Sequence, residues 1–136
     1  MNGIRDISEA TAPASIERLM LEAEVQSTCV KWMRARGYWA RKFSSMSQRS
    51  VPDYLFSKER GPLISTIDDC HTHRFYIKFF CEFKREGCKV DKETGFMSTQ
   101  AQLDEQAAMR EAGWDGFECS DVDEFKRWVL AYERNA

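Results

Sequence analysis

Between residues 75 and 84, apolar side chains alternate with a mixed set of polar and aromatic ones. One face of this segment carries only apolar residues, which are Phe75, Ile77, Phe79, Cys81 and Phe83. The other face carries Tyr76, Lys78, Phe80, Glu82 and Lys84. A period of two residues is typical of a strand with one buried face, so the pattern predicts that Glu82 and Lys84 project from the same side of a sheet.

Three further strands are predicted, at residues 38–43, 51–56 and 114–119. In the second of these, Asp53 and Leu55 point one way and Tyr54 and Phe56 the other. Pro52 places the start of that strand, or a sheet edge, at this point because proline donates no ladder hydrogen bond. Residues 44–50 are rich in serine and predict a loop, and residues 57–74, which contain Gly61-Pro62, predict an irregular excursion.

Three helices complete the pattern. Pro13 and Ser15 open the first, which Gly37 ends; Thr99 opens the second, which Gly113 closes; Ser120 caps the third. The order helix, three strands, helix, strand, helix predicts an α/β fold with a central mixed sheet flanked by helices. At 136 residues the chain is long enough for one domain, predicted at residues 15–136 after a flexible N-terminus at residues 1–14.

Composition narrows the class of protein. Charged residues make up 31% and aromatic residues 12%, as in ordinary globular domains. There is no apolar run near 18 residues and no signal-peptide core at the N-terminus, so we expect a protein of the cytoplasm and no membrane partner. The five cysteines are odd in number and form no Cys-x-x-Cys pair, which predicts free thiols in a reducing compartment.

The charge is unevenly distributed, although the net charge is only −2. No Asp or Glu occurs from residue 25 to residue 52, and aromatic residues interleave the bases there: Lys31, Arg34, Arg36, Arg41, Lys42 and Arg49. A basic segment that leads into Asp53 could grip a phosphate backbone. The competing interpretation is a solvated surface. We take Arg34, Arg36, Arg41, Lys42 and Arg49 as the predicted DNA-binding residues.

Asp53, Glu82 and Lys84 together suggest phosphodiester hydrolysis. Two carboxylates that converge on a divalent ion, with an ammonium group beside them, can stabilise charge on a phosphate and activate a water molecule. Hard oxygen ligands of this kind favour Mg²⁺ or Mn²⁺. The alternative for Glu82 and Lys84 alone is a surface ion pair.

At this point the sequence resembles the VRR-NUC family, a branch of the PD-(D/E)xK nucleases. The matching stretches run in order along most of the chain: Glu22-Ala23-Glu24-Val25-Gln26, Val51-Pro52-Asp53, Glu82-Phe83-Lys84, and Gln102 followed by Gly113. The resemblance implies a restriction-endonuclease-like core. Either Glu22 or Glu24 would be the carboxylate that the first helix contributes.

The resemblance also implies a role for each site residue. Asp53, Glu82 and the backbone carbonyl of Phe83 would hold Mg²⁺ or Mn²⁺, with Glu22 binding the ion directly or through water. Lys84 would orient the attacking water, and Gln102 would hold Lys84 or the phosphate. Because Thr99-x-x-Gln102 also fits a capping box, a purely structural role for Gln102 stays open.

Branched DNA, four-way junctions included, is the substrate that the resemblance implies, and a stand-alone phage protein acting in the host cytoplasm is the implied source. We also predict a homodimer, because paired cuts need two sites. A second reason is a surplus of large side chains: Trp32, Tyr38, Trp39, Met46, Tyr54, Trp114 and Trp128. The alternatives are a monomeric flap or nicking nuclease and a non-catalytic DNA-binding subunit.

Two other readings are disfavoured by the residues themselves. The RecB-like branch of these nucleases needs a tyrosine four residues after its glutamine, where this chain has Gln106. The segment Cys70-His71-Thr72-His73 resembles part of a zinc site, but no second ligand pair lies at a suitable spacing.

Overall fold

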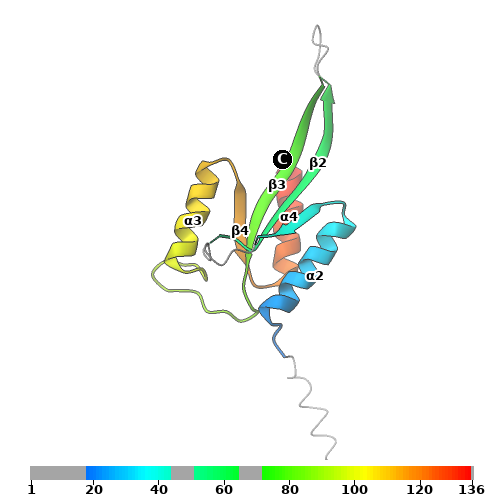
Figure 1. Ribbon diagram of the computed structural model, residues 1–136. Helices are drawn as coiled ribbons and strands as arrows, with labels where there is room; N and C mark the ends of the chain where they lie inside the picture. The colour runs from blue at the N-terminus through cyan, green and yellow to red at the C-terminus, as the bar shows by residue number, and fades with distance from the viewer. Residues whose placement is uncertain (1–17, 44–50, 65–71, 136) are drawn as a thin grey trace, which may run out of the picture.

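A computed structural model describes residues 18–43, 51–64 and 72–135 (Figure 1). Along the chain the elements are α2 (Glu22–Ala35), β1 (Trp39–Lys42), β2 (Tyr54–Ile64), β3 (Thr72–Phe83), α3 (Gln100–Glu111), β4 (Asp115–Cys119) and α4 (Val122–Asn135). The described part is therefore an α/β structure with the element order that the sequence predicts.

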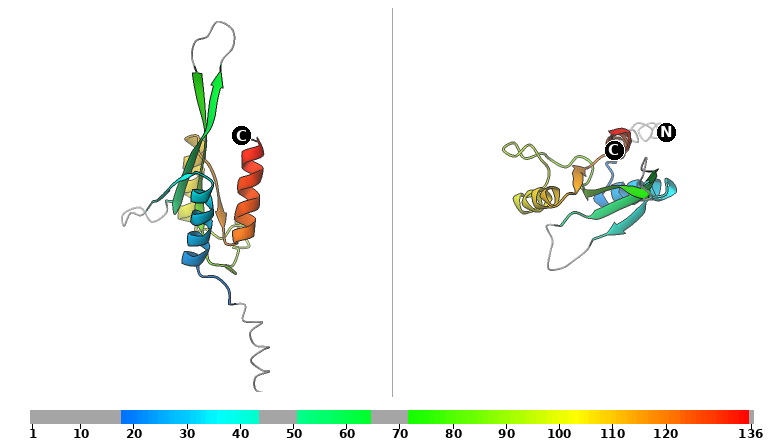
Figure 2. Two further views of the ribbon diagram at one scale, coloured as in Figure 1. Left: turned by 90° about the vertical axis from the view of Figure 1, so that its right-hand side faces the viewer. Right: turned by 90° about the horizontal axis from the view of Figure 1, so that it is seen from above.

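The four strands form one mixed sheet in the order β1-β2-β3-β4. β1 pairs antiparallel with β2, β2 antiparallel with β3, and β3 parallel with β4. The parallel pair is joined through α3, as a parallel connection requires. β2 and β3 form a long hairpin that rises beyond the other elements in Figures 1 and 2.

One face of the sheet is covered by α2 and α4, which lie side by side (Figure 2). The apolar alternation of β3 is confirmed here, because Phe79, Cys81 and Phe83 are fully buried in the core and Ile77 is nearly so. Phe56 of β2 and Phe125 of α4 pack against them. Burying such aromatic side chains contributes roughly 1.5–3 kcal/mol each, so this face holds the main hydrophobic core.

The opposite face of the sheet holds the polar alternation of β3. Phe80 is nevertheless fully buried there, because its ring lies against Gly116 of β4 and under the guanidinium of Arg110 from α3. A Cβ atom at residue 116 would lie 2.3 Å from the Phe80 ring, so only glycine fits. This contact docks α3 next to the end of β3 that carries Glu82 and Lys84.

Several predicted boundaries are wrong. The first helix does not run continuously from residue 15, because residues 18–21 are not helical and α2 begins at Glu22. Pro13, Ser15 and the predicted flexible segment 1–14 lie outside the described residues. The predicted excursion over residues 57–74 is largely strand, because β2 runs on to Ile64 and β3 starts at Thr72, with a register shift at Glu59–Gly61 that absorbs the glycine. The serine-rich segment 44–50 also lies outside the described residues.

The cap of the last helix is shifted by one residue from the prediction. Asp121, not Ser120, caps α4, since its side chain accepts a hydrogen bond from Asp123 N at 2.9 Å and its carbonyl accepts one from Phe125 N. Three other helix ends agree with the sequence: Thr99 caps α3, and Gly37 and Gly113 follow α2 and α3 with positive φ angles of 89° and 101°.

The predicted surplus of large apolar side chains is mostly absent. Tyr38 is buried, and Trp32, Tyr54 and Trp128 pack against the core. Trp39 remains 50% exposed, while Met46 lies outside the described residues. Surplus aromatic residues therefore give little support to a homodimer.

No helix in the described ranges is long and apolar enough to cross a membrane. The four described cysteines, Cys29, Cys81, Cys88 and Cys119, are free thiols as predicted, and Cys70 is not among the described residues. Burial raises the pKa of Cys29 to about 12 and that of Cys119 to about 11, so these thiols are inert core residues.

Candidate active site

Four of the predicted site residues meet at one end of the sheet, where β2 begins and β3 ends. Asp53 Oδ2 accepts a hydrogen bond from the backbone N–H of Phe83 at 2.9 Å. Lys84 Nζ lies 3.6 Å from Glu82 Oε2 and donates a hydrogen bond to Gln102 Oε1 at 2.9 Å. Gln102 Nε2 in turn donates to Glu82 Oε2 at 3.1 Å. The ion pair between Glu82 and Lys84 exists, but it is buried among other site residues and is not a surface pair.

Gln102 forms the predicted capping box and also contacts two of the other predicted site residues. Thr99 Oγ1 accepts a hydrogen bond from Gln102 N, and Gln102 Oε1 accepts one from Thr99 N at 2.8 Å, which together form the capping box. The same Oε1 atom accepts the hydrogen bond from Lys84, while the amide nitrogen reaches Glu82. The cap therefore fixes the orientation of the amide that holds the lysine and the carboxylate.

The two glutamates of the first helix have different surroundings. Glu24 is bound by Arg18 at 2.9 and 3.0 Å and by Leu21 N at 2.8 Å, and these contacts lower its pKa. Glu22 is exposed at the start of α2, but partial burial and the charge of Asp53 raise its pKa, and Lys84 and Lys42 oppose the rise. Glu22 is thus the helix carboxylate that is electrostatically coupled to Asp53, and Glu24 is part of the helix cap.

Burial and mutual repulsion dominate the electrostatics of the cluster. Burial, reinforced by the charge of Asp53, raises the pKa of Glu82 to about 8, although Lys84 favours the ionised form. Burial also raises the pKa of Asp53, against the hydrogen bond from Phe83 N and the charge of Lys84. The Glu82 side chain is only 5% exposed. Three carboxyl groups at one site thus compete for too little positive charge.

The donor set fits a hard divalent cation. Glu82 Oε1 is buried and has no hydrogen-bond partner among the described residues, an arrangement that is costly unless a proton or a cation binds there. A cation bound at Glu82 would also be close to the carboxyl group of Asp53. No set of three His, Cys, Asp or Glu side chains in the described part of the chain is close enough to form a complete metal site by itself. Two carboxylates would need backbone and water oxygens to complete the coordination, which is common for Mg²⁺.

The predicted DNA-binding residues are only partly brought together. Lys42 acts electrostatically on Asp53 and Glu22, and Arg41 is its exposed neighbour on β1. Arg36 is instead committed to an ion pair with Glu133 of α4 and stacks on Trp32. Arg49 lies outside the described residues.

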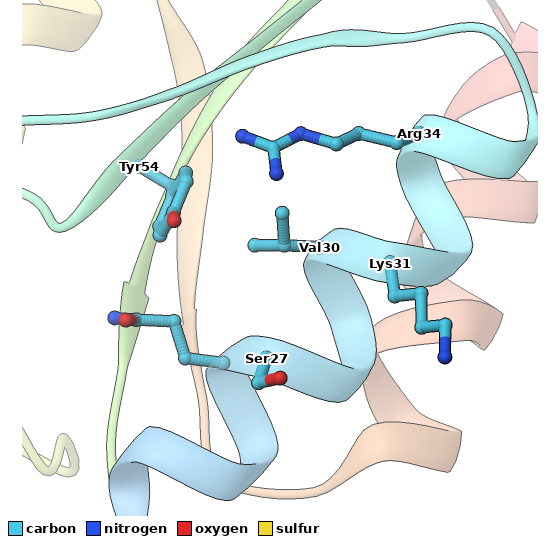
Figure 3. Close-up of a pocket in the computed structure, with 6 residues that line it drawn as sticks. Ser27, Val30, Lys31, Arg34 and Tyr54 are labelled. Carbon is cyan, nitrogen blue, oxygen red and sulfur yellow. The ribbon is translucent and has the colours of Figure 1, made fainter.

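Arg34 lies at a hollow of about 320 Å³ between α2 and β2. Figure 3 shows its guanidinium extending toward Tyr54 across Val30, whereas Lys31 points away. Gln26, the last residue of the first matching stretch, lines this hollow too. Arg34 also donates a hydrogen bond to Ala40 O at 3.1 Å, which ties it to β1. Arg34 therefore places a positive charge at this hollow, on the face of the sheet that α2 covers.

Sequence reasoning missed Glu118 and Ser98, which hold α3 in place. Glu118 lies beside Glu82 in the β3–β4 register and accepts hydrogen bonds from Met97 N, Ser98 N and Ser98 Oγ at 2.7–2.9 Å. Gln106 Nε2 donates to Ser98 Oγ at 3.2 Å. These bonds fix the segment immediately before Thr99. Glu118 stands between Phe117 and Cys119 in the short strand 115–119, and a charged residue between two apolar ones is the sequence signal that could have indicated such a role.

Comparison of the chain with protein-family models gave no match, and comparison with curated proteins gave none either.

Proposed function

We propose that this protein is a metal-dependent deoxyribonuclease with a restriction-endonuclease-like core of the PD-(D/E)xK type, akin to the VRR-NUC family. The observation that carries the proposal is the meeting of Asp53, Glu82, Lys84 and Gln102 at one end of the sheet. They lie at the start of β2, at the end of β3 and in α3, and two carboxyl groups beside an ammonium group are the chemistry that metal-assisted hydrolysis of a phosphodiester uses.

Asp53, Glu82 and the backbone carbonyl of Phe83 would hold Mg²⁺ or Mn²⁺, with Glu22 as a direct or water-mediated ligand. When bound, the ion would neutralise charge on the scissile phosphate and lower the pKa of a water molecule. It would also offset the burial that raises the pKa values of Glu82, Asp53 and Glu22, and the repulsion by Asp53 that adds to the rise for Glu82 and Glu22.

Lys84 is the residue of this chain placed to act on the water and the phosphate. Its ammonium group has three donors, of which one goes to Gln102, and it lies within ion-pair distance of Glu82. Gln102 positions Lys84 and Glu82 without needing to touch the substrate. A preorganised ammonium group of this kind stabilises the charge that develops in the transition state.

A non-catalytic DNA-binding subunit is the second candidate, and the burial of the site disfavours it. Buried carboxylates that repel each other destabilise a folded protein, and surface contacts with DNA do not require them. Perturbed carboxyl groups grouped with a lysine are instead typical of catalytic sites.

A cleavage panel tests the proposed function directly. Purified protein is incubated with Mn²⁺ or Mg²⁺ and labelled duplex, single-stranded, flapped and four-way DNA. We expect cleavage of at least one branched substrate, no cleavage in EDTA, and binding without cleavage in Ca²⁺. Absence of cleavage from every substrate with both metals would favour the non-catalytic subunit.

Reversal of charge on β1 should weaken DNA binding. For Arg41→Glu/Lys42→Glu we expect weaker binding in Ca²⁺ and a salt dependence whose slope falls by roughly one for each lost phosphate contact, because each contact releases counterions. The measurement is fluorescence anisotropy over a salt series. Arg127→Glu, on an exposed residue of α4, is the matched control. An unchanged slope would mean that β1 is only a solvated surface.

The homodimer remains a prediction that rests on the substrate, since two matched cuts in a four-way junction need two sites. Light scattering with and without junction DNA should then give twice the 15.9 kDa of one chain. A monomer mass under both conditions would favour a flap or nicking nuclease.

A further inference from the structure

β1, at one edge of the sheet, and the residue that follows it expose two large aromatic side chains. Trp39 is 50% and Phe43 is 43% exposed. Ala40 packs against the core, so strand alternation directs Trp39 and Arg41 to the other face of the sheet. Among the described elements, α3 packs on β4 at the far edge, so β1 and β2 have no helix over this face.

These side chains form one surface. Trp39, Arg41, Lys42, Phe43 and Leu55 line a shallow hollow of about 440 Å³. Arg41 is paired across the sheet with Leu55, and its guanidinium lies 5.5 Å from the centre of the Trp39 ring. Arg41 lies between the two exposed aromatic residues on this face, and Lys42, which alternation directs with Ala40 to the other face, borders the hollow, so the surface offers both stacking and positive charge. We call these five residues the stacking platform.

The stacking platform runs directly into the candidate active site. Phe43 N donates a hydrogen bond to the backbone carbonyl of Asp53 at 2.7 Å. The charge of Lys42 is felt by both Asp53 and Glu22. A strand lying on Trp39 and Phe43 would therefore continue toward the carboxylates with its phosphates near Lys42.

We propose that the stacking platform binds an unpaired DNA strand, whose bases stack on Trp39 and Phe43 and whose phosphates contact Arg41 and Lys42. This inference rests on the proposed nuclease function and specifies how its substrate is held. Exposed aromatic side chains beside cations bind single strands without sequence preference, because every base has a face that can stack. In a duplex those faces are already stacked on neighbouring bases.

A second copy of this chain is the competing occupant of the same edge strand. Pairing of β1 with its own copy about a two-fold axis would bring the cations of Arg41 and Lys42 close to their counterparts, which disfavours the contact. The charge of the surface instead complements a polyanion.

The test compares oligo(dT) with a duplex of the same length, using full-length protein in Ca²⁺ so that cleavage does not interfere. Trp39→Ala and Phe43→Ala should each weaken oligo(dT) binding roughly tenfold and change duplex binding by less than about twofold. Trp39→Phe should retain most of the affinity because it keeps an aromatic face. Phe96→Ala is the matched control, since Phe96 is 47% exposed and lines a hollow at the β4 edge.

Three results would overturn the stacking platform. They are unchanged oligo(dT) affinity in both alanine variants, an equal loss for duplex and oligo(dT), or a dimer mass that Trp39→Ala reduces to that of a monomer. Because the assay measures binding alone, its outcome is independent of the nuclease proposal. If the protein never cuts DNA but these variants lose oligo(dT) binding, the stacking platform is supported and the nuclease proposal is contradicted. If the protein cuts DNA and the variants bind oligo(dT) as tightly as the unmodified protein, the nuclease proposal is supported and the stacking platform is contradicted.

Discussion

Asp53→Asn and Lys84→Met should each reduce the rate of DNA cleavage roughly a thousandfold or more at saturating Mn²⁺. Asn keeps the shape of Asp53 and can still accept the hydrogen bond from Phe83 N, but it removes the negative charge that would bind the ion. Met keeps most of the length of Lys84 and removes the ammonium group that Gln102 holds. Neither change removes a core side chain, so the loss should appear in kcat at unchanged fold.

The controls for this prediction separate chemistry from binding and folding. Arg85→Ala changes an exposed basic residue next to Lys84 and should cleave at nearly the rate of the unmodified protein. Both site variants should still bind branched DNA in Ca²⁺ and show unchanged circular dichroism. Cleavage by Asp53→Asn at the unmodified rate would contradict the proposed metal ligand set, and full activity of Lys84→Met would remove the lysine from the mechanism.

Glu82→Gln should stabilise the metal-free protein by roughly 1 to 3 kcal/mol at pH 8. Burial and Asp53 raise the folded-state pKa of Glu82 from its ordinary 4.5 to about 8. The folded protein therefore retains a proton that the unfolded chain releases between these pH values, and the stability of the protein falls as the pH rises from 4.5 through 8. Glutamine cannot ionise, so the variant escapes the loss, and the two proteins should be nearly equally stable at pH 4.

Urea unfolding in EDTA at pH 4, 6 and 8 measures this difference. Glu111→Gln, on an exposed residue at the end of α3, should show no comparable gain. Addition of Mn²⁺ at pH 8 should stabilise the unmodified protein and have little effect on Glu82→Gln, because the ion binds the ionised carboxylate. Equal stability of the two proteins at pH 8 would mean that Glu82 is neither desolvated nor repelled by Asp53.

The elements that sequence reasoning predicted best are those with strong local signals. The alternation of β3 identifies its buried face, because a strand with one buried face must follow a period of two. The ends of α3 are likewise marked by local signals, since its capping residues Thr99 and Gln102 and the following Gly113 make hydrogen bonds to residues close to them in the chain. The continuation of β2 beyond residue 56 was not predicted, because Gly61-Pro62 is typical of a turn or loop. The pairing with β3, which accommodates these residues through a register shift, is not visible in the local sequence.

By itself, the sequence determined the α/β order of elements and the identity of the candidate site residues. The tertiary structure decided which of them meet, because those contacts join residues far apart in the chain. Asp53 and Phe83 meet through strand pairing, and Glu82 and Gln102 meet because Phe80 and Gly116 dock α3 beside β3. The tertiary structure also gave Glu22 and Glu24 different electrostatic surroundings. It paired Arg36 with Glu133 and left Trp39 exposed. Local hydrogen bonding is encoded within a few residues, whereas burial, repulsion and exposure depend on what the folded chain places around each side chain.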